Sequence, residues 1–575
     1  MATELISLGI LFFCAVIGGI IATKFKQPAV FGLLLVGAII GPHSFNIVKD
    51  VNMITMMADF GAILLLFVIG LEFDFSKLAK TGARSLIIGL LKFAIVLFLG
   101  FEATMLLGFG IKAALFMGVI LSFSSTVVIV KVLEQKEMFS RKEVPLLVAI
   151  LVIEDIIAVL ALTFFSGMKD AGSGIIPLFE KVIFAIAVLV FAYFITMKLL
   201  RKSTNLILKN NTDESVFAFL SLGLGALFSY LAFYLGLTPS AGAFLAGSLI
   251  ASLPNSKEYG KAIHPYALIF TAIFFISMGT LVDFDVIRSN IPLIGVLIAT
   301  IFLSRFIAIG FLTFLLANFK NDQPFFSSIA MMSIGEFSLL VAKESKNFNV
   351  GIDLVTITAA IIFLSAIMMS IGINYSEKMH SGFKSRVPLK TKFKLDRISG
   401  YMRGFFDQME IETFFTKKLR IEFKSASMHL VAIVFLVIAL RRLSVPVKDY
   451  SVLLSYAFYA VCFAAVAYSL KLLFTRLKSI HYTLSVILTN VDSSRNIKKC
   501  TYILNNLLIA LLFLFAAMFF PFAMFAFNLG SWSNFVSIGL MILSVYYFRN
   551  IMLLIEGVRN IPSYNAGVIA ASKFS

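Results

Sequence analysis

Charged side chains are scarce in this sequence. They make up 14% of the 575 residues, whereas soluble domains carry about one-quarter. Hydrophobic residues make up 60%, and the mean hydropathy is +0.97. Apolar runs of about 20 residues recur, each long enough to cross a hydrocarbon core as a helix. They do not alternate polar and apolar residues as barrel strands do. We therefore expect an all-α polytopic membrane protein that lies in the lipid bilayer.

Cysteine is equally rare, and the three cysteines show no C-x-x-C spacing. The cysteines therefore suggest neither a disulfide framework nor a zinc site. The five histidines are scattered near the ends of the apolar runs without metal-ligand spacing. We expect no transition-metal site and no cofactor.

Basic residues outnumber acidic ones, giving a net charge of +18. They gather in alternate loops, as the positive-inside rule requires of cytoplasmic loops. The charge therefore indicates orientation rather than binding of nucleic acid. It places the N-terminus outside and the C-terminus in the cytoplasm, in the plasma (inner) membrane. Residues 5–22 are interpreted as the first span, because no basic segment precedes them and no signal-cleavage site follows.

The apolar runs predict three regions. About 13 spans precede residue 376, a basic cytoplasmic linker covers residues 377–427, and a further transmembrane region of unknown role covers residues 428–575. Within the linker, residues 398–421 alternate aromatic and basic side chains, which fits an interfacial helix or a solvated linker. The last region contains about four extra spans, near residues 429–440, 451–473, 502–527 and 535–555.

A faint internal repeat links spans that lie seven apart. Residues 28–37 and 239–247 both begin with proline and contain spaced glycines, and residues 67–74 resemble residues 275–285. An odd offset inverts the second copy across the membrane, a common plan in transporters. The alternative is chance recurrence of Gly and Phe. The expected halves are residues 1–168 and 213–376, joined by a span near residues 174–200.

Glu154 and Asp155 stand side by side in the sixth apolar run. Each charge at the bilayer centre costs roughly 2.5–3.5 kcal/mol on insertion scales, so such a pair needs a compensating role. Adjacent helical residues point about 100° apart, so one can face a watery cavity and the other a protein partner. A partly desolvated carboxylate can trade a proton for a small cation. The alternative is a buried ion-paired couple with no role in transport.

Two other apolar runs carry polar interruptions. Residues 122–126 contain Ser124, Ser125 and Thr126, and residues 333–338 contain Gly335 and Glu336. Each lies fifth in its half, and paired interruptions predict a midplane site built from half-helix ends. The alternative is hydroxyl groups bonding to the i−4 carbonyl inside continuous helices.

Arg305 is interpreted as the one basic residue deep in an apolar run, with Glu154 as its expected salt-bridge partner. If Glu154 is neutralised in this way, Asp155 alone cycles between proton and cation, which favours one-for-one exchange. Asp59 and Glu336 are weaker candidates for direct contact with the ion. Each is interpreted as a structural counter-ion or as a residue that lines a cavity entrance. Lys343 is expected to extend to the outer surface.

Several motifs together resemble one family. They are residues 67–72, 124–126, 242–247, 274–279 and 335–337, with the acidic pair ending in Asp155. Over residues 1–376 the chain resembles the transmembrane domain of the monovalent cation:proton antiporter-2 family, particularly its Kef-like branch. The resemblance implies a 13-span inverted-repeat fold with two crossed discontinuous helices, in a homodimer. It also implies that Asp155 binds the ion and carries the proton, with Glu154 as partner acid, Thr126 at the helix crossing and Arg305 paired with the acid.

The chain also departs from that branch. Kef systems typically have Gln-Asp where this chain has Glu154-Asp155, which leaves the choice between sodium and potassium open. Their nucleotide-binding regulatory domain, with its Gly-rich loop after a strand, has no counterpart here, so nucleotide regulation is not expected.

The sequence therefore predicts a secondary active antiporter that exchanges Na⁺ or K⁺ for H⁺. The alternative is a gated cation channel or efflux system on the same scaffold. An enzyme is not expected, because the acidic pair has neither an accompanying nucleophile nor a Gly-x-Gly-Asp pattern.

Overall fold

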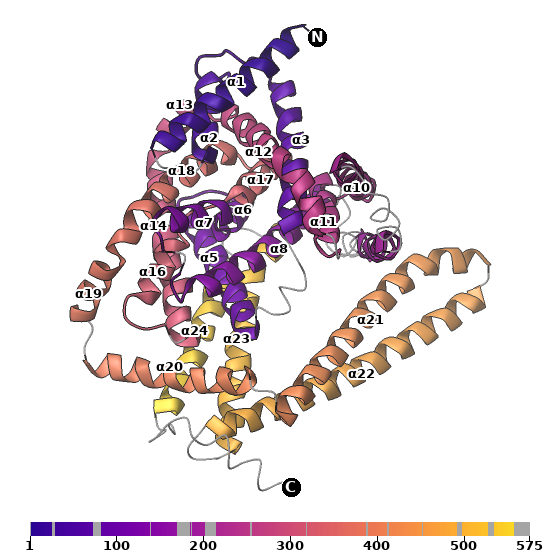
Figure 1. Ribbon diagram of the computed structural model, residues 1–575. Coiled ribbons are helices and arrows are strands. Elements are labelled where there is room, and N and C mark those ends of the chain that lie inside the picture. Colours follow the sequence, from indigo (N-terminus) through magenta and orange to yellow (C-terminus); the bar gives the residue numbers. More distant parts are fainter. Residues whose placement is uncertain are drawn as a thin grey trace. The chain divides into compact units, whose positions relative to one another are not determined.

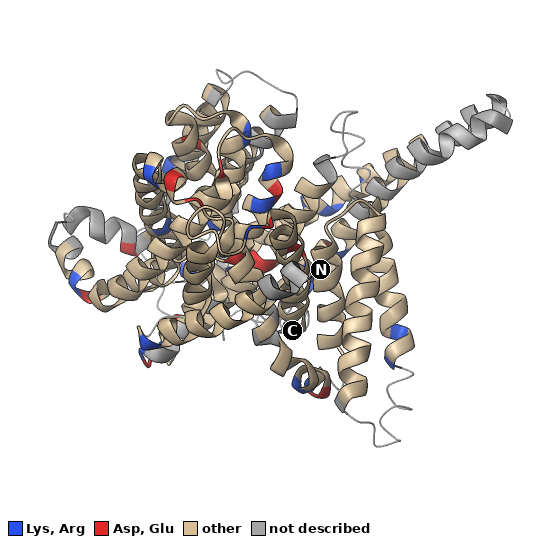
Figure 2. Cartoon of the chain, turned by 90° about the horizontal axis from the view of Figure 1, so that it is seen from above, with Lys and Arg blue, Asp and Glu red and all other residues tan. Residues whose placement is uncertain are grey.

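Apolar runs form helices throughout the part of the chain that the structure, a computed structural model, describes. That part is residues 2–25, 29–72, 82–138, 140–169, 184–185, 187–201, 214–253, 256–317, 319–386, 389–410, 413–450, 452–491, 497–526 and 534–556. Within it no strand occurs, and seven helices are long and apolar enough to span a membrane. Charged residues are sparse along the ribbon (Figure 2). Pro28, Asp74 and residues 174–183, which belong to predicted motifs or spans, lie outside the described residues.

The chain divides into two compact units. The first contains Met1–Thr313, Phe319–Ser385 and Met518–Asn534, and the second contains Phe314–Asn318, Arg386–Ala517 and Phe535–Ser575. The predicted boundaries at residues 376 and 427 and the predicted halves stay predictions.

Helices of the first unit fall into two groups that pack mainly among themselves (Figure 1). One group comprises α1 (Ala2–Lys24), α2 (Ala29–Ile40), α3 (Val51–Glu72), α10 (Glu214–Tyr234), α11 (Pro239–Ala251) and α12 (Ser256–Thr280). The other comprises α5 (Gly82–Leu106), α6 (Ile111–Ser122), α7 (Thr126–Gln135), α8 (Val144–Lys169), α14 (Ile291–Arg305), the π-helix η1 (Phe306–Phe311), α16 (Gln323–Ala330), α17 (Glu336–Ser345) and α18 (Leu354–Gly372).

Side chains and prolines define several helix starts. Asp283 caps the short α13 (Phe284–Ser289) by accepting a hydrogen bond from the Asp285 amide at 2.8 Å. Asp353 caps α18 in the same way, through the Val355 amide at 3.1 Å. Pro239 occupies the first turn of α11, where its missing N–H costs nothing. These local signals start the helices where the apolar runs begin.

Glycines allow close helix contacts in two matching places. Gly37 of α2 lies against Gly279 of α12, and Gly247 of α11 lies against Gly70 of α3. A Cβ atom at Gly37 would collide with the Ile276 carbonyl oxygen, and one at Gly247 would collide with a carbonyl oxygen of α3. Small residues that let backbones approach are typical of membrane helix interfaces.

The second unit contains α20 (Leu389–Glu410), α21 (Phe414–Tyr450), α22 (Val452–Val491), most of α23 (Ile497–Ala526) and most of α24 (Asn534–Glu556). Helices α21 to α24 cover the four apolar runs predicted beyond residue 428. Long helices α21 and α22 lie side by side as a hairpin (Figure 1).

Helix α20 covers the first part of the segment predicted to be an interfacial helix or a solvated linker. Its Ile398, Tyr401 and Phe405 side chains are buried. The structure thus shows a helix with buried side chains over this part of the segment, and the choice between an interfacial helix and a solvated linker stays a prediction.

Candidate functional site

Two helices of the first unit are interrupted, and their breaks lie against each other. Helix α6 ends at Ser122, Phe123 is extended, and α7 begins at Thr126. Helix α16 ends at Ala330, Gly335 is extended, and α17 begins at Glu336. The Ser125 amide donates to the Ser333 carbonyl at 2.9 Å, and an isolated antiparallel bridge joins Ser124 to Ile334. Each break thus satisfies backbone groups of the other, as a bilayer interior demands.

Gly335 permits this close approach. A Cβ atom there would lie 2.8 Å from both the Ser124 carbonyl oxygen and the Ser125 Cα atom, closer than real Cβ atoms come to backbone. The second break therefore requires glycine at this position.

The acidic pair lies on α8, beside the first break. Glu154 is 1% exposed and Asp155 is 7% exposed. Glu154 Oε2 accepts a hydrogen bond from the Ser124 amide at 2.8 Å. Glu154 therefore accepts a hydrogen bond from a backbone N–H group that has lost its helical partner at the break. Asp155, the next residue, points in another direction around the axis of α8.

Lys92 of α5 makes the ion pair with Glu154. It is fully buried, and its Nζ atom lies 2.5 Å from Glu154 Oε1. Arg305 is therefore not the one deep basic side chain that we predicted, because Lys92 is a second one. The signal was present, because Lys92 lies ten residues inside a 25-residue helix and is too far from either end to reach the surface.

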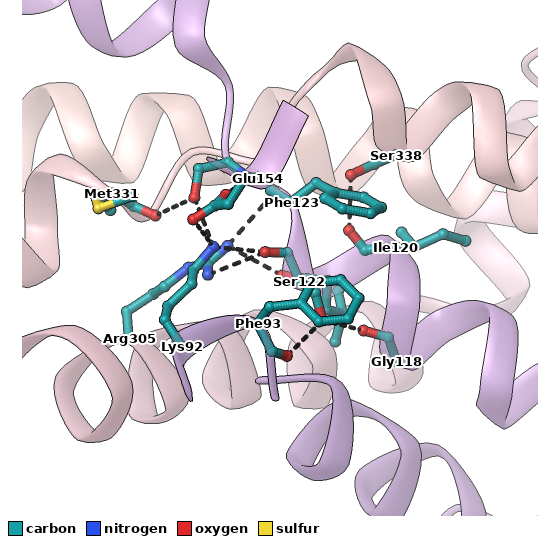
Figure 3. Close-up of polar contacts among 12 residues, drawn as sticks. Lys92, Phe93, Gly118, Ile120, Ser122, Phe123, Glu154, Arg305, Met331 and Ser338 are labelled. Atoms are coloured by element: carbon teal, nitrogen blue, oxygen red, sulfur yellow. Dashed lines mark hydrogen bonds and ion pairs between the residues drawn. The ribbon is translucent and has the colours of Figure 1, made fainter. Parts of the chain in front are cut away.

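Arg305 has different partners from those expected. Its guanidinium Nη2 donates to the Leu121 carbonyl at 3.0 Å, and Nη1 lies 3.5 Å from the Ser122 carbonyl. The expected Arg305–Glu154 salt bridge is therefore corrected: in the described structure Lys92 pairs with Glu154, and Arg305 binds the C-terminal end of α6. That end carries partial negative charge, which favours a cation. Figure 3 shows Lys92 and Arg305 pointing toward the same break.

Glu336 begins α17, where the positive end of the helix dipole favours an acid. It is 5% exposed, and Ser125 Oγ donates to its Oε2 atom at 3.3 Å. Two residues further along α17, Ser338 Oγ donates to the Ile120 carbonyl at 2.7 Å (Figure 3). Glu336 thus lies at the paired breaks, in the interruption where the sequence placed it.

Two hydroxyl groups at the breaks have buried oxygens with no hydrogen-bond partner in the described part of the chain. They are Thr126 Oγ1 and Ser333 Oγ. Leaving a buried hydroxyl unsatisfied is costly. Such oxygens are suitable ligands for a desolvated hard cation.

Asp59 lies apart from the breaks. It is on α3 and forms an ion pair with Lys343 of α17. Lys343 is seven residues beyond Glu336, which places it roughly 10 Å along the helix axis. Lys343 thus has an acidic partner, where the sequence suggested only that it extends to the surface.

Among the described residues, no group of three or more His, Cys, Asp or Glu side chains could hold a metal ion. Direct contacts connect most of the predicted site residues with one another. These are Ser124, Ser125, Glu154, Gly335 and Glu336, with Thr126 and Asp155 next to them in the chain. Arg305 contacts the adjoining carbonyl groups of residues 121–123 instead.

Comparisons with known proteins show the family to which this chain belongs. The sequence model of the family described as "Sodium/hydrogen exchanger, transmembrane" matches residues 10–374. The "K(+) efflux antiporter 5" of Arabidopsis thaliana is 26% identical, over 58% of this chain and 60% of that protein. The "Probable Na(+)/H(+) antiporter GerT" of Bacillus cereus is 26% identical, over 59% of this chain and 90% of that protein.

A solved structure shares the fold. The sodium proton antiporter MjNhaP1 from Methanocaldococcus jannaschii superposes with a TM-score of 0.50 at 18% identity. The alignment covers 66% of this chain and 99% of that one.

Proposed function

We propose, from the premise that this chain belongs to the sodium/hydrogen exchanger transmembrane family, that it exchanges a monovalent cation for a proton across a membrane. It is then a transporter rather than an enzyme. The relatives named as sodium or potassium antiporters support this activity and leave both cations as candidates.

The finer architecture is part of the proposal. Residues 1–376 form a 13-span inverted-repeat fold in which α6–α7 and α16–α17 are the two crossed discontinuous helices, and the protein is a homodimer. The paired breaks and the bridge between Ser124 and Ile334 support the crossing. The matching glycine contacts of α2 with α12 and of α11 with α3 support the repeat.

Asp155 is the proposed exchange residue. Glu154 is committed to Lys92 and to the Ser124 amide, so it is poorly placed to release its charge during a cycle. Asp155 is the neighbouring buried carboxylate, beside a break that contributes the unsatisfied Thr126 hydroxyl. The observation that carries the proposal is this combination of a buried acid with unpaired oxygens at paired helix breaks. In the exchange, a bound cation leaves as Asp155 takes a proton, and the reverse.

The first test uses the full-length protein in liposomes that carry a pH-sensitive dye. Sodium, potassium or lithium is added in turn, and cation-dependent proton movement is recorded. Asp155→Asn keeps the size of the side chain and removes its charge, so we expect at least about a hundredfold loss of exchange. The matched control is Asp285→Asn, at an exposed aspartate on α13, which should exchange as the unaltered protein does.

Normal exchange by Asp155→Asn would show that the assigned residue is wrong. Steady conductance of the unaltered protein without a coupled pH change would instead favour the gated cation channel. The two outcomes are distinct, because the first preserves coupled exchange and the second lacks it.

A further inference from the structure

Helices α21 and α22 of the second unit carry a cluster of basic residues at one level of their hairpin (Figure 1). Arg476 of α22 makes an ion pair with Glu422 of α21 at 3.0 Å, and Ser479 donates to the same carboxylate at 3.2 Å. These contacts place residues 417–424 beside residues 471–478. By helix rise, the two segments together span roughly 15–20 Å along the hairpin. We call them the basic collar, because they contain seven lysines and arginines and one acid.

The positive charge of the collar is only partly balanced. Its single acid, Glu422, is buried and bound to Arg476. Three exposed lysines of the collar make no ion pair within the part of the chain that the structure describes. They are Lys424, Lys471 and Lys478. The collar therefore attracts anions from outside the hairpin.

Both helices repeat one pattern on the face turned away from the Glu422–Arg476 contact. Lysine alternates with a large exposed apolar residue at steps of three or four, which keeps all of them on one side of a helix. The residues are Lys417, Ile421, Lys424 and Met428 on α21, and Lys471, Phe474, Lys478 and Tyr482 on α22. The Ile421 side chain is 67% exposed and that of Phe474 is 72% exposed. Such faces combine a surface for apolar chains with ammonium groups for anions.

The collar borders apolar helix segments of about bilayer thickness. Towards the turn of the hairpin, residues 425–440 and 450–470 contain no Asp, Glu, Lys or Arg. By helix rise these runs are roughly 24 and 31 Å long, and the hydrocarbon core of a bilayer is about 30 Å thick. If the runs lie in the hydrocarbon, the collar lies at the depth of the lipid headgroups.

We propose that the basic collar binds anionic phospholipids of the leaflet that it faces. The ammonium groups of Lys424, Lys471 and Lys478 bind the phosphate, and the apolar side chains between them lie against the acyl chains. Lysine suits this position, because its stem can lie along apolar surface while its charge reaches the headgroups. Each basic residue near an anionic membrane surface adds to the attraction.

Orientation of the chain in the membrane does not by itself explain the collar. The positive-inside rule concerns the number of basic residues in a loop. It does not require that they alternate with exposed residues such as Ile421 and Phe474. Phospholipid binding accounts for both the charge and the apolar faces, and it does not depend on the proposed exchange activity.

The test uses the full-length protein, purified in detergent and freed of lipid. Phosphatidylglycerol or phosphatidylcholine is added, and the unfolding temperature and the mass of intact protein–lipid complexes are measured. A ligand that binds the folded state raises the unfolding temperature. Phosphatidylglycerol should raise it at lower concentration than phosphatidylcholine. The triple variant Lys424→Gln, Lys471→Gln, Lys478→Gln should need at least about tenfold more phosphatidylglycerol for the same effect.

Matched variants separate the collar from total charge. Lys257→Gln, Lys261→Gln, Lys346→Gln together remove the same charge from exposed lysines of the first unit, and this protein should bind phosphatidylglycerol as the unaltered protein does. Arginine at the three collar positions keeps the charge and should keep the binding. Inorganic phosphate added alone should leave the unfolding temperature unchanged.

Equal responses of the unaltered protein to the two lipids would overturn the proposal. So would an equal loss of phosphatidylglycerol binding in the matched first-unit variant. Stabilisation by inorganic phosphate alone would show a site for a soluble anion instead. If the collar variant does not fold, high salt decides with the unaltered protein, because screening should weaken phosphatidylglycerol binding. Lipid binding is measured without an ion gradient, so its failure is distinct from a failure of cation exchange.

Discussion

At the scale of single residues, a substitution of Thr126 can test cation binding independently of protein stability. Its Oγ1 atom has no hydrogen-bond partner within the described residues. Thr126→Val keeps the shape of the side chain and removes no hydrogen bond, so thermal stability should be kept or slightly increased. If Oγ1 is a cation ligand, the apparent KM for the cation should rise by about tenfold. Flux measured against cation concentration, together with a thermal unfolding curve, checks both expectations.

Thr104→Val is the matched control for Thr126. The Thr104 hydroxyl is buried but donates to the Gly100 carbonyl at 2.8 Å, inside a continuous helix. Its removal should leave the apparent KM unchanged. An equal change of KM in both variants would mean that Thr126 acts through helix packing.

Charged residues also show how far the sequence predicts the site. The cost of burying charge makes Glu154 and Asp155 conspicuous in an apolar run, and that reasoning identified both. The sequence does not predict which basic residue forms the ion pair with Glu154, because that depends on which helices pack against each other. Lys92 and Arg305 are both intramembrane cations, and only the packing of α5 against α8 gives Glu154 to Lys92.

At the scale of secondary structure, Gly335 makes the contact between the two helix breaks possible. Gly335→Ala places a Cβ atom against the backbone of Ser124 and Ser125, neither of which can rotate away. Overpacking of this kind costs about 1–3 kcal/mol. We expect a lower unfolding temperature and a large loss of exchange, measured on the same purified sample.

Gly295→Ala provides the contrast in α14. No atom would lie within 4 Å of a Cβ atom there, and alanine is about 0.5–1 kcal/mol better than glycine in a helix interior. This variant should be as stable as the unaltered protein or more so. A Gly335→Ala protein of equal stability and activity would show that the breaks separate without cost.

The positions of the breaks followed from local sequence, but their pairing did not. Serines, threonine and glycine inside apolar runs identified residues 122–126 and 333–338 as interruptions. The alternative of i−4 bonding holds only for Ser122, whose Oγ atom donates to the Gly118 carbonyl at 2.7 Å. The bond from the Ser125 amide to the Ser333 carbonyl joins residues far apart in the chain, so no local pattern contains it.

At the scale of the whole molecule, the predicted repeat relates two helix interfaces. The sequence matched the second apolar run to the ninth and the third to the tenth. Under this relation, the contact of α2 with α12 corresponds to that of α11 with α3, and each contains a close pair of glycines. A chance recurrence of glycine in the sequence would not by itself place both pairs at corresponding interfaces.

The predicted repeat implies matching behaviour of Gly37 and Gly247. A Cβ atom at either position would collide with a carbonyl oxygen of the facing helix, so Gly37→Ala and Gly247→Ala should destabilise the protein by similar amounts, about 1–3 kcal/mol each. Thermal unfolding of the two purified variants measures this, with Gly260→Ala as the control, because a Cβ atom there meets nothing within 4 Å. If one variant is tolerated as well as the control while the other unfolds, the two interfaces are not equivalent and the repeat is wrong at this pair of helices.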